Sequence, residues 1–273
     1  MTAASREQFA ALVRTAPVDL ALAALLVGAE TEPDLDLGAA EVALAALAAD
    51  VPTGVAGEPA SVSAARLVEV LHPYSGRRED FADLRSSLLH EVIRRRRGLP
   101  ILLAVLWVEV GRRAGIPAYP VGMPGHFLVG VGDPDGDHVL VDAFRGGLVV
   151  SLAEAERLAV DSAGIALTPS HLRPTEPVDV LMRLLTNIRV YAAGLTASLD
   201  NVTTRLWAVE LSLLLPRHPV DLRRERAELL VRVGGFQQAS LEFHRFADAV
   251  EGADPEAALA ARAAARVSLS RCN

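Results

Sequence analysis

Apolar residues at helical spacing dominate the first third of the chain. Residues 5–50 are rich in Ala and Leu and show no strand-like alternation. Pro, Gly and Ser predict a loop over 51–63, and a helix then runs through AARLVEVL to a stop near His72 and Pro73. We therefore expect helices throughout this region.

The next two segments predict a pair of helices. DFADLRSSLLHEVIRRRRG has two candidate capping carboxylates, Asp80 and Asp83, and ends in arginines before Gly98. Pro100 suits the first turn of a second helix, ILLAVLWVEVGRRAG, over 101–115. This second helix is apolar nearly all round, so we expect it to be buried on most faces.

The pattern then changes to short Val-rich runs, which predict strands: AYPVGM, HFLVGV and HVLVDAF. GDPDGD separates the last two runs and is typical of a hairpin turn. His126 begins one of these strands and Asp142 ends the other. Antiparallel pairing could bring the two side chains close together.

Helical patterns return from SLAEAERLAV onward, with three tail segments at about 202–215, 219–233 and 236–250. VDLRRERAELLVRVGGFQQASLEFHRFADAV resembles a tetratricopeptide-type helix pair. One such pair favours a helical lid packed on the first domain over an independent peptide-binding array. The expected fold is α+β, with an N-terminal helical segment (1–60), a core with a small antiparallel sheet (61–175) and a helical tail (176–273).

The composition of the chain argues against several classes of function. The 273 residues carry a net charge of −7, and all 27 basic residues are arginine, which argues against general nucleic-acid binding. No run approaches a membrane span, and the first residues lack the apolar centre of a signal peptide. The single cysteine, Cys272, can form no internal disulfide. We expect a cytoplasmic protein that binds neither membranes nor nucleic acid.

His126 and Asp142 suggest acyl-transfer chemistry. Such chemistry needs a nucleophile at a helix N-terminus, an imidazole base and a carboxylate that orients the imidazole. The helix at Pro100 could present the nucleophile, with His126 as the base and Asp142 as the orienting group. Two other interpretations stay open: a structural histidine, and a turn carboxylate that accepts backbone N–H bonds.

Metal, cofactor and phosphate sites have weaker support. The seven histidines show no HxH or HxxxH spacing, and no GxGxxG or P-loop motif occurs, so we expect no cofactor and no metal. One facultative metal cluster remains conceivable, with His126, His138 and Asp142 facing one another across the hairpin. Arg94–Arg97 are expected to offset a helix dipole, although one of them could bind a carboxylate near His126 and Asp142.

The middle of the chain resembles the SirB-type transglutaminase-like proteins. LLHEVIRRRRGLPILLAVLWVEVGRRAGIPAYPVGMPGHFLVGV, followed by VDAFRGG, carries that family's motifs in order throughout 88–147. LHPYSGRREDF upstream and LLTNIRVYAAG downstream extend the resemblance. It implies a papain-like core followed by a tetratricopeptide-like tail. It also places His126 and Asp142 as the second and third members of a Cys-His-Asp triad, with the nucleophile at or next to Leu102.

The chain departs from this pattern at the nucleophile. The sequence reads GLPILLAVLW, and neither Leu102 nor the next several residues carry a thiol or hydroxyl, so acyl transfer cannot start there. We therefore expect a non-catalytic binding or regulatory scaffold whose helical tail contacts a protein partner; no oligomeric state is favoured.

The alternative is an amide or peptide hydrolase, or an acyltransferase, that uses His126 and Asp142 with a displaced nucleophile or a water. Ser86 and Ser87 lie in the preceding predicted helix, more than a turn upstream. Cys272 would require the tail to fold back.

Overall fold

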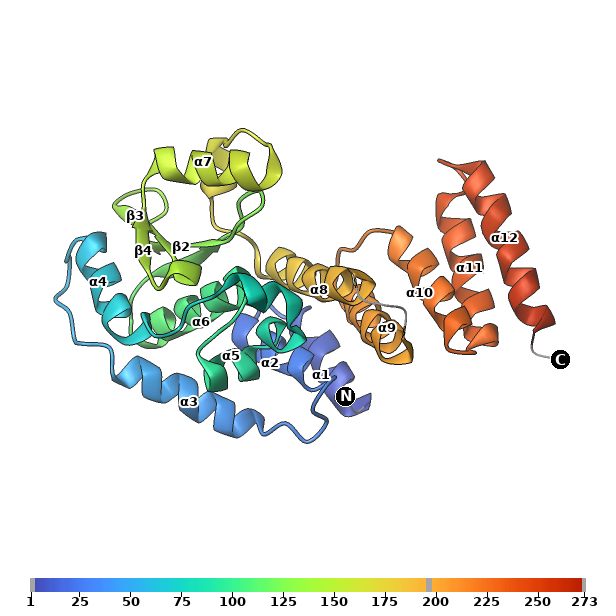
Figure 1. Cartoon of the computed structure of the whole chain (residues 1–273), viewed down its shortest axis with the longest axis horizontal. Helices are drawn as coiled ribbons and strands as arrows, with labels where there is room; N and C mark the ends of the chain where they lie inside the picture. The colour runs from blue at the N-terminus through green and yellow to red at the C-terminus, as the bar shows by residue number, and fades with distance from the viewer. Residues whose placement is uncertain (1–2, 195–197, 272–273) are drawn as a thin grey trace. The chain divides into compact units, whose positions relative to one another are not determined.

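The computed structural model describes residues 3–194 and 198–271, so Cys272 lies outside the described residues. The chain forms two compact units. The first unit comprises the residues up to Gln8 and Pro17–Leu184, and the second comprises Phe9–Ala16 and the residues from Leu185 onward. Figure 1 colours the elements in chain order.

Eight α-helices begin within the first 184 residues: α1 Ala3–Leu12, α2 Leu20–Gly28, α3 Leu37–Ala49, α4 Ala60–Leu71, α5 Leu89–Arg95, α6 Pro100–Arg113, α7 Leu152–Ala163 and α8 Pro177–Gly194. The predicted helices over 5–50 are confirmed as α1 to α3. Asp19 and Asp36 cap α2 and α3 by accepting backbone N–H bonds, which ends the loops before them. Over the described residues, no helix is long and apolar enough to cross a membrane.

Helix α6 forms the centre of the first unit. It lies against α2, α3, α4 and α5 and against strands β1 (Ala118–Val121) and β2 (Leu128–Gly132). Its four largest fully buried side chains are Leu102, Leu103, Leu106 and Trp107. Each such burial contributes about 1.5–3 kcal/mol, so the apolar sequence fixes this helix in the core. The prediction of a buried helix that begins at Pro100 is confirmed.

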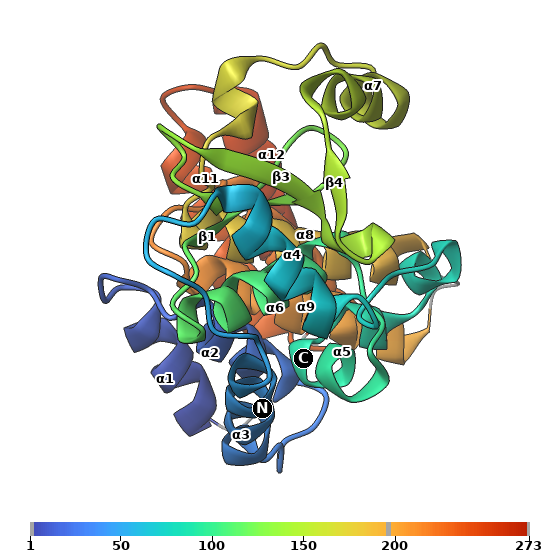
Figure 2. The same ribbon diagram turned by 90° about the vertical axis from the view of Figure 1, so that its left-hand side faces the viewer.

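The four-stranded antiparallel sheet has the order β1-β2-β3-β4, with β3 over His138–Asp142 and β4 over Leu148–Val150. Helices α4 and α6 lie on one side of it and α7 on the other (Figure 2). The α+β prediction is therefore confirmed, although the three-residue β4 was not predicted. Thr175 lies along β1, where its N–H donates to Pro120 O at 2.8 Å and its hydroxyl accepts the Gly122 N–H.

The prediction of one helix over 80–98 is wrong. This stretch contains two 3₁₀ helices, η1 (Arg78–Ala82) and η2 (Leu84–Ser87), before the short α5. The Asp80 and Asp83 side chains accept backbone N–H bonds from Arg77 and Arg85, which gives the backbone an alternative to the α-helix. Leu88 is extended, and the helix stops at Arg96 in a left-handed conformation instead of at Gly98.

The second unit is helical. It contains α9 Leu199–Leu214, α10 Asp221–Arg232, α11 Phe236–Val250 and α12 Pro255–Ser270. The first three match the predicted tail segments, whereas α12 was not predicted. Helices α10, α11 and α12 pack in succession around Phe243, Phe246 and small residues such as Ala239 and Ala261. Small residues let the helices approach closely, which accounts for the Ala-rich tail.

Candidate functional site

His126 and Asp142 form a hydrogen-bonded pair in the structure. Asp142 ends β3, and His126 precedes β2 by two residues. The register places Val129 opposite Val141, so the start of β2 and the end of β3 lie side by side at the end of the hairpin away from its turn. His126 Nε2 lies 3.0 Å from Asp142 Oδ2. The hairpin predicted from GDPDGD therefore brings the two side chains together.

Asp142 serves both as the partner of His126 and as a turn carboxylate. Its side chain is fully buried. Oδ1 accepts the backbone N–H groups of Phe144 and Arg145 at 3.0 and 3.2 Å, which caps the short 3₁₀ helix η3 (Ala143–Arg145). Oδ2 accepts Arg145 Nε at 2.8 Å in addition to His126. Every lone-pair direction of this carboxylate is thus used, and its orientation is fixed.

The charge on Asp142 determines the tautomer of His126. Burial raises the pKa of Asp142, but the hydrogen bonds and charges of His126 and Arg145 outweigh burial and hold the pKa below its ordinary value. An ionised carboxylate can only accept hydrogen bonds, so Nε2 of His126 must carry the proton. In neutral His126 the lone pair is then on Nδ1. Nδ1 makes no hydrogen bond to any residue that the structure describes, and the side chain is 15% exposed.

Arg145 is a member of this site that the sequence reasoning did not single out. Its Nε binds Asp142, and its Nη2 reaches Glu154 Oε1 on α7 at 3.0 Å. Burial lowers the pKa of Arg145, but its bonds to Asp142 and Glu154 outweigh this and raise it, so the side chain stays cationic. In the sequence, the position of Arg145 three residues after Asp142 in VDAFRGG could have indicated this contact.

Arg183 of α8 supports the loop that carries His126. Its Nη2 donates to the carbonyls of Met123 and His126 at 3.2 and 3.3 Å, and its guanidinium lies 4.8 Å from the centre of the Phe127 ring. Burial lowers the pKa of Arg183. Because Arg183 lies 57 residues from His126 in the chain, no sequence spacing indicated this contact.

Leu102 is the third residue of α6, and its side chain is fully buried. Helix α6 contains no Cys, Ser or Thr at any position. The side chain at the predicted nucleophile position is therefore part of the packed core.

The two serines considered as substitutes lie closer to this helix than their sequence positions suggested. They belong to η2 and not to an α-helix, and Ser86 O accepts the N–H of Leu99, the residue before α6, at 2.9 Å. The Ser86 hydroxyl is buried and donates to Asp80 at 3.0 Å. Ser87 is 2% exposed, and its hydroxyl has no hydrogen-bond partner within the described ranges. Ser87 is thus the less constrained of the two.

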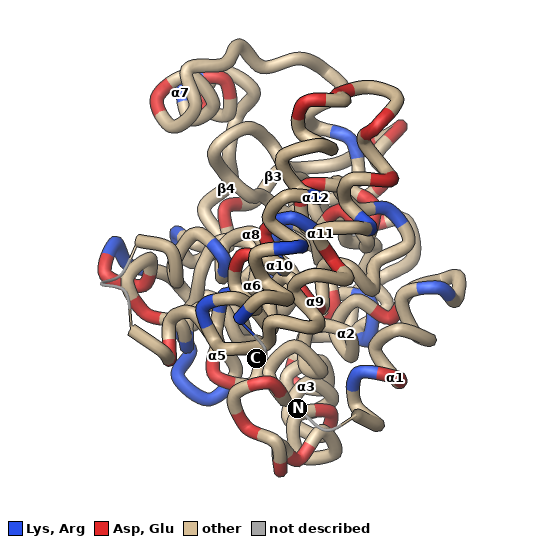
Figure 3. Tube along the Cα trace, turned by 90° about the vertical axis from the view of Figure 1, so that its right-hand side faces the viewer, with Lys and Arg blue, Asp and Glu red and all other residues tan. Residues whose placement is uncertain are grey.

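The arginine run does not form a basic surface. Arg94 pairs with Glu91, Arg95 with Asp83 and Arg97 with Asp80, while Arg96 lies over the Tyr74 ring. The three carboxylates neutralise Arg94, Arg95 and Arg97 locally, and the run does not pair with the His126–Asp142 site. Acidic and basic residues also alternate along the Cα trace in Figure 3.

The structure contradicts the hypothesis that His126, His138 and Asp142 form a metal site. His138 pairs with Gly132 at the opposite end of the hairpin and is exposed. It begins β3, whereas Asp142 ends it, a separation of about 13 Å along an extended strand. His138 Nδ1 instead lies 3.0 Å from Gly136 O.

A cavity of about 810 Å³ lies elsewhere in the first unit, and neither His126 nor Asp142 lines it. Two of its carboxylates already have partners: Glu58 binds Ser63 and Arg66, and Asp137 accepts the Ala60 N–H. It is therefore a poor alternative to the histidine site.

Comparisons with known proteins agree with the α+β fold. Residues 38–186, more than half of the chain, match the family model described as the transglutaminase-like superfamily. A UPF0162 protein of Xylella fastidiosa (strain Temecula1) is 39% identical over 125 residues, which is 44% of each chain. A UPF0162 protein of Pseudomonas aeruginosa is 35% identical over 105 residues, 38% of each chain.

A more distant similarity is to F-box only protein 21 of Mus musculus, 28% identical over 178 residues, which is 63% of this chain and 26% of that protein. The similarity thus spans less than half the length of the bacterial relatives and about a quarter of the mouse protein.

Proposed function

This chain belongs to the transglutaminase-like superfamily, and we propose that it is a non-catalytic member that uses the His126–Asp142 pair to bind a ligand. The observation that carries the proposal is the fully buried Leu102 in a helix without any thiol or hydroxyl. Leucine has no lone pair to attack a carbonyl and no proton for His126 to remove.

The imidazole supplies the binding chemistry in this proposal. With the proton on Nε2, the Nδ1 lone pair accepts a hydrogen bond from an N–H or O–H group of the ligand. Arg145 stays charged, and its side chain is 38% exposed, so it adds a donor for a carboxylate or carbonyl oxygen. Asp142 holds both groups in place.

We also propose a family branch, a cellular location and a kind of partner for this chain. The order of GLPI, PGHFLV and VDAFRGG supports membership of the SirB-type branch. The single cysteine supports a cytoplasmic location. A protein partner of the helical tail is supported by Leu241 and Leu259, which are 58% and 66% exposed on α11 and α12. Leu241→Glu with Leu259→Glu should abolish co-purification of such a partner, and unchanged co-purification would contradict this part.

The alternative function is hydrolysis of an amide by a water that His126 activates through Nδ1. The same free lone pair favours it, because a general base needs an unprotonated nitrogen within reach of the water. Ser87 would be the displaced nucleophile in a covalent version.

Covalent labelling distinguishes these functions. Purified protein with Cys272→Ala, which removes the single thiol of the chain, is treated with a serine-directed fluorophosphonate probe and with a panel of chromogenic amides. We expect no labelling and no turnover. Labelling or hydrolysis that disappears in His126→Ala would overturn the non-catalytic proposal. Labelling that disappears in Ser87→Ala would identify the nucleophile.

A second measurement tests the binding chemistry directly. In protein with ¹⁵N-labelled histidine, the neutral form of His126 should give the signal of an unprotonated ring nitrogen at Nδ1 and that of an N–H at Nε2. The reverse assignment would remove the acceptor on which the proposed binding depends.

A further inference from the structure

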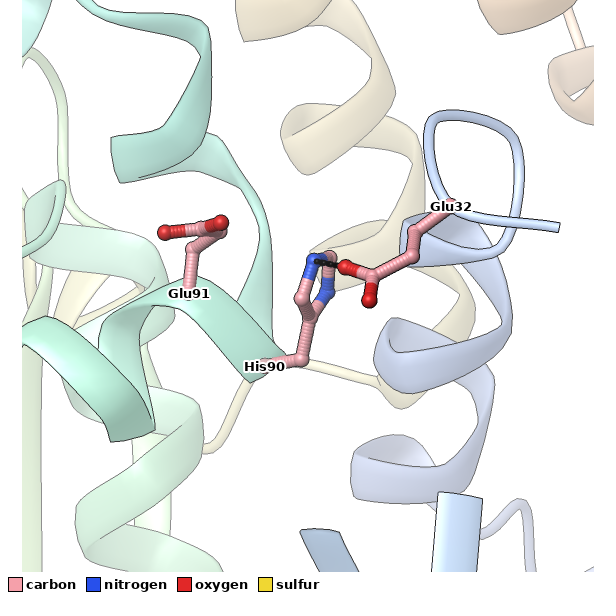
Figure 4. Close-up of side chains that lie close together, drawn as sticks. All are labelled: Glu32, His90 and Glu91. Carbon is pink, nitrogen blue, oxygen red and sulfur yellow. Dashed lines mark ion pairs between the residues drawn. The ribbon is translucent and has the colours of Figure 1, made fainter. Parts of the chain in front are cut away.

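A second histidine, His90, lies between two carboxylates in the first unit. It is on α5, next to Glu91, and Glu32 reaches it from the turn after α2 (Figure 4). One potential ligand atom from each of Glu32, His90 and Glu91 lies within 4.8 Å of the other two. His126 and Asp142 are not part of this cluster.

The two buried members have polar atoms without partners. The side chains of His90 and Glu91 are each 7% exposed. Nδ1 of His90 and Oε2 of Glu91 make no hydrogen bond within the part of the chain that the structure describes. Arg94 occupies only the other oxygen of Glu91, Oε1, and its own side chain is 64% exposed. Of these two atoms, Nδ1 faces Gly28, so the buried Glu91 oxygen without a partner is the one that indicates a missing ligand beside the cluster.

The backbone around the cluster fixes the direction of the ring. Nδ1 of His90 faces Gly28 of α2, where a Cβ would lie only 2.3 Å from it. The other nitrogen, Nε2, therefore faces Glu32, whose Oε2 lies 3.5 Å away. Gly28 O in turn accepts the N–H groups of Thr31 and Glu32, which holds the turn that carries Glu32.

We propose that Glu32, His90 and Glu91 form a binding site for a divalent transition-metal ion of the zinc type. One imidazole nitrogen and two carboxylate oxygens are a donor set that such ions accept, with water completing the coordination. Two ligands of one ion lie at most about 4.4 Å apart, twice the metal–ligand distance. Glu32, half exposed, has room to rotate toward an ion and leaves a path from solvent.

The protonation state of the histidine agrees with this role. Burial lowers the pKa of His90 against the opposing charges of Glu91 and Glu32, so the ring is neutral near pH 7 and its lone pair is available. The sequence could not indicate this cluster, because Glu32 is 58 residues from His90 and short metal-ligand spacings do not describe such a pair.

Equilibrium dialysis of the full chain against zinc alone tests the proposal, with Cys272→Ala as the background so that the tail thiol binds no metal. We expect one zinc ion per chain, bound more weakly at pH 6 than at pH 7.5 because protons compete for the ligands. Glu32→Gln and Glu91→Gln should each weaken binding about tenfold or more, and His90→Gln should abolish it. Asp34→Asn, an exposed carboxylate two residues from Glu32, is the matched control and should bind as the background does.

Absence of saturable binding, or equal binding by the Glu32→Gln variant and the background, would overturn the proposal. Glu32 is half exposed, so its variant keeps the test decisive if a substitution at a buried position prevents folding. At the same zinc concentration, zinc should also raise the unfolding temperature of the background protein more than that of Glu32→Gln.

Discussion

Arg145 and His126 donate to the same oxygen of one buried carboxylate, at 2.8 and 3.0 Å from Oδ2 of Asp142. The carboxylate is therefore not reserved for the histidine. It joins the end of β3, the loop before β2 and, through Arg145 and Glu154, helix α7. This shared role predicts that Asp142 contributes to stability whether or not the site binds a ligand.

Asp142→Asn should lower the free energy of unfolding by about 2–4 kcal/mol, because it leaves Arg145 and His126 beside a buried neutral group. Urea titration followed by tryptophan fluorescence measures the change. Glu154→Gln is the control: it removes the outer partner of Arg145 and should cost less than about 1 kcal/mol. Equal losses in the two variants would show that the buried carboxylate has no special role.

Acid should remove the contribution of Asp142. Its pKa in the folded protein lies below the ordinary value of about 3.9, so the unfolded chain binds a proton first as the pH falls. The contribution is complete above about pH 5 and is lost as the pH falls through the folded pKa. The stability difference between the wild type and Asp142→Asn should therefore shrink below about pH 4. A difference that stays constant down to pH 3 would contradict the lowered pKa.

Gly147→Ala should destabilise the first unit by about 1–3 kcal/mol. Gly147 has φ of +91°, and an added Cβ would lie 2.6 Å from the Trp107 ring. Gly57→Ala is a control with a similar φ of +77° and no atom within 4 Å of the added Cβ. Thermal unfolding of both variants separates the cost of the left-handed conformation, which they share, from the contact with Trp107. Identical shifts in unfolding temperature would mean that Trp107 moves without cost.

Arg183→Met should cost about 1–3 kcal/mol, because methionine can still cover Phe127 but leaves the carbonyls of Met123 and His126 without their donor. The histidine signals in NMR spectra should shift as the loop loosens. Arg173→Met removes the exposed pair with Asp135 and should change neither observable measurably. Unshifted His126 signals in Arg183→Met would show that Arg183 does not position the loop.

Continuous apolar patterns made the central fold predictable. Helix α6 and the β2–β3 hairpin follow directly from ILLAVLWVEVG and from valine-rich runs on either side of a turn, because burial and turn chemistry act within a few residues. The same hairpin brought His126 to Asp142. The role of Leu102 at the nucleophile position remains a prediction that rests on the resemblance.

Residues that act through distant partners could not be predicted. The aspartates that replace a long helix over 80–98 with two short 3₁₀ turns bind backbone groups that a propensity pattern does not reveal. Arg183 reaches the His126 loop from α8, and Glu32 reaches His90 from the turn after α2. Contacts of this kind depend on the packing of whole elements, and one sequence does not encode them at any fixed spacing.

The two edges of the sheet have a consequence for association with other chains. At one edge, Pro120 of β1 has no N–H to donate and its carbonyl is already bonded by Thr175. At the other edge, β4 has only three residues. Neither edge offers a long row of open backbone groups, so both resist strand addition and the intermolecular β-pairing that starts aggregation.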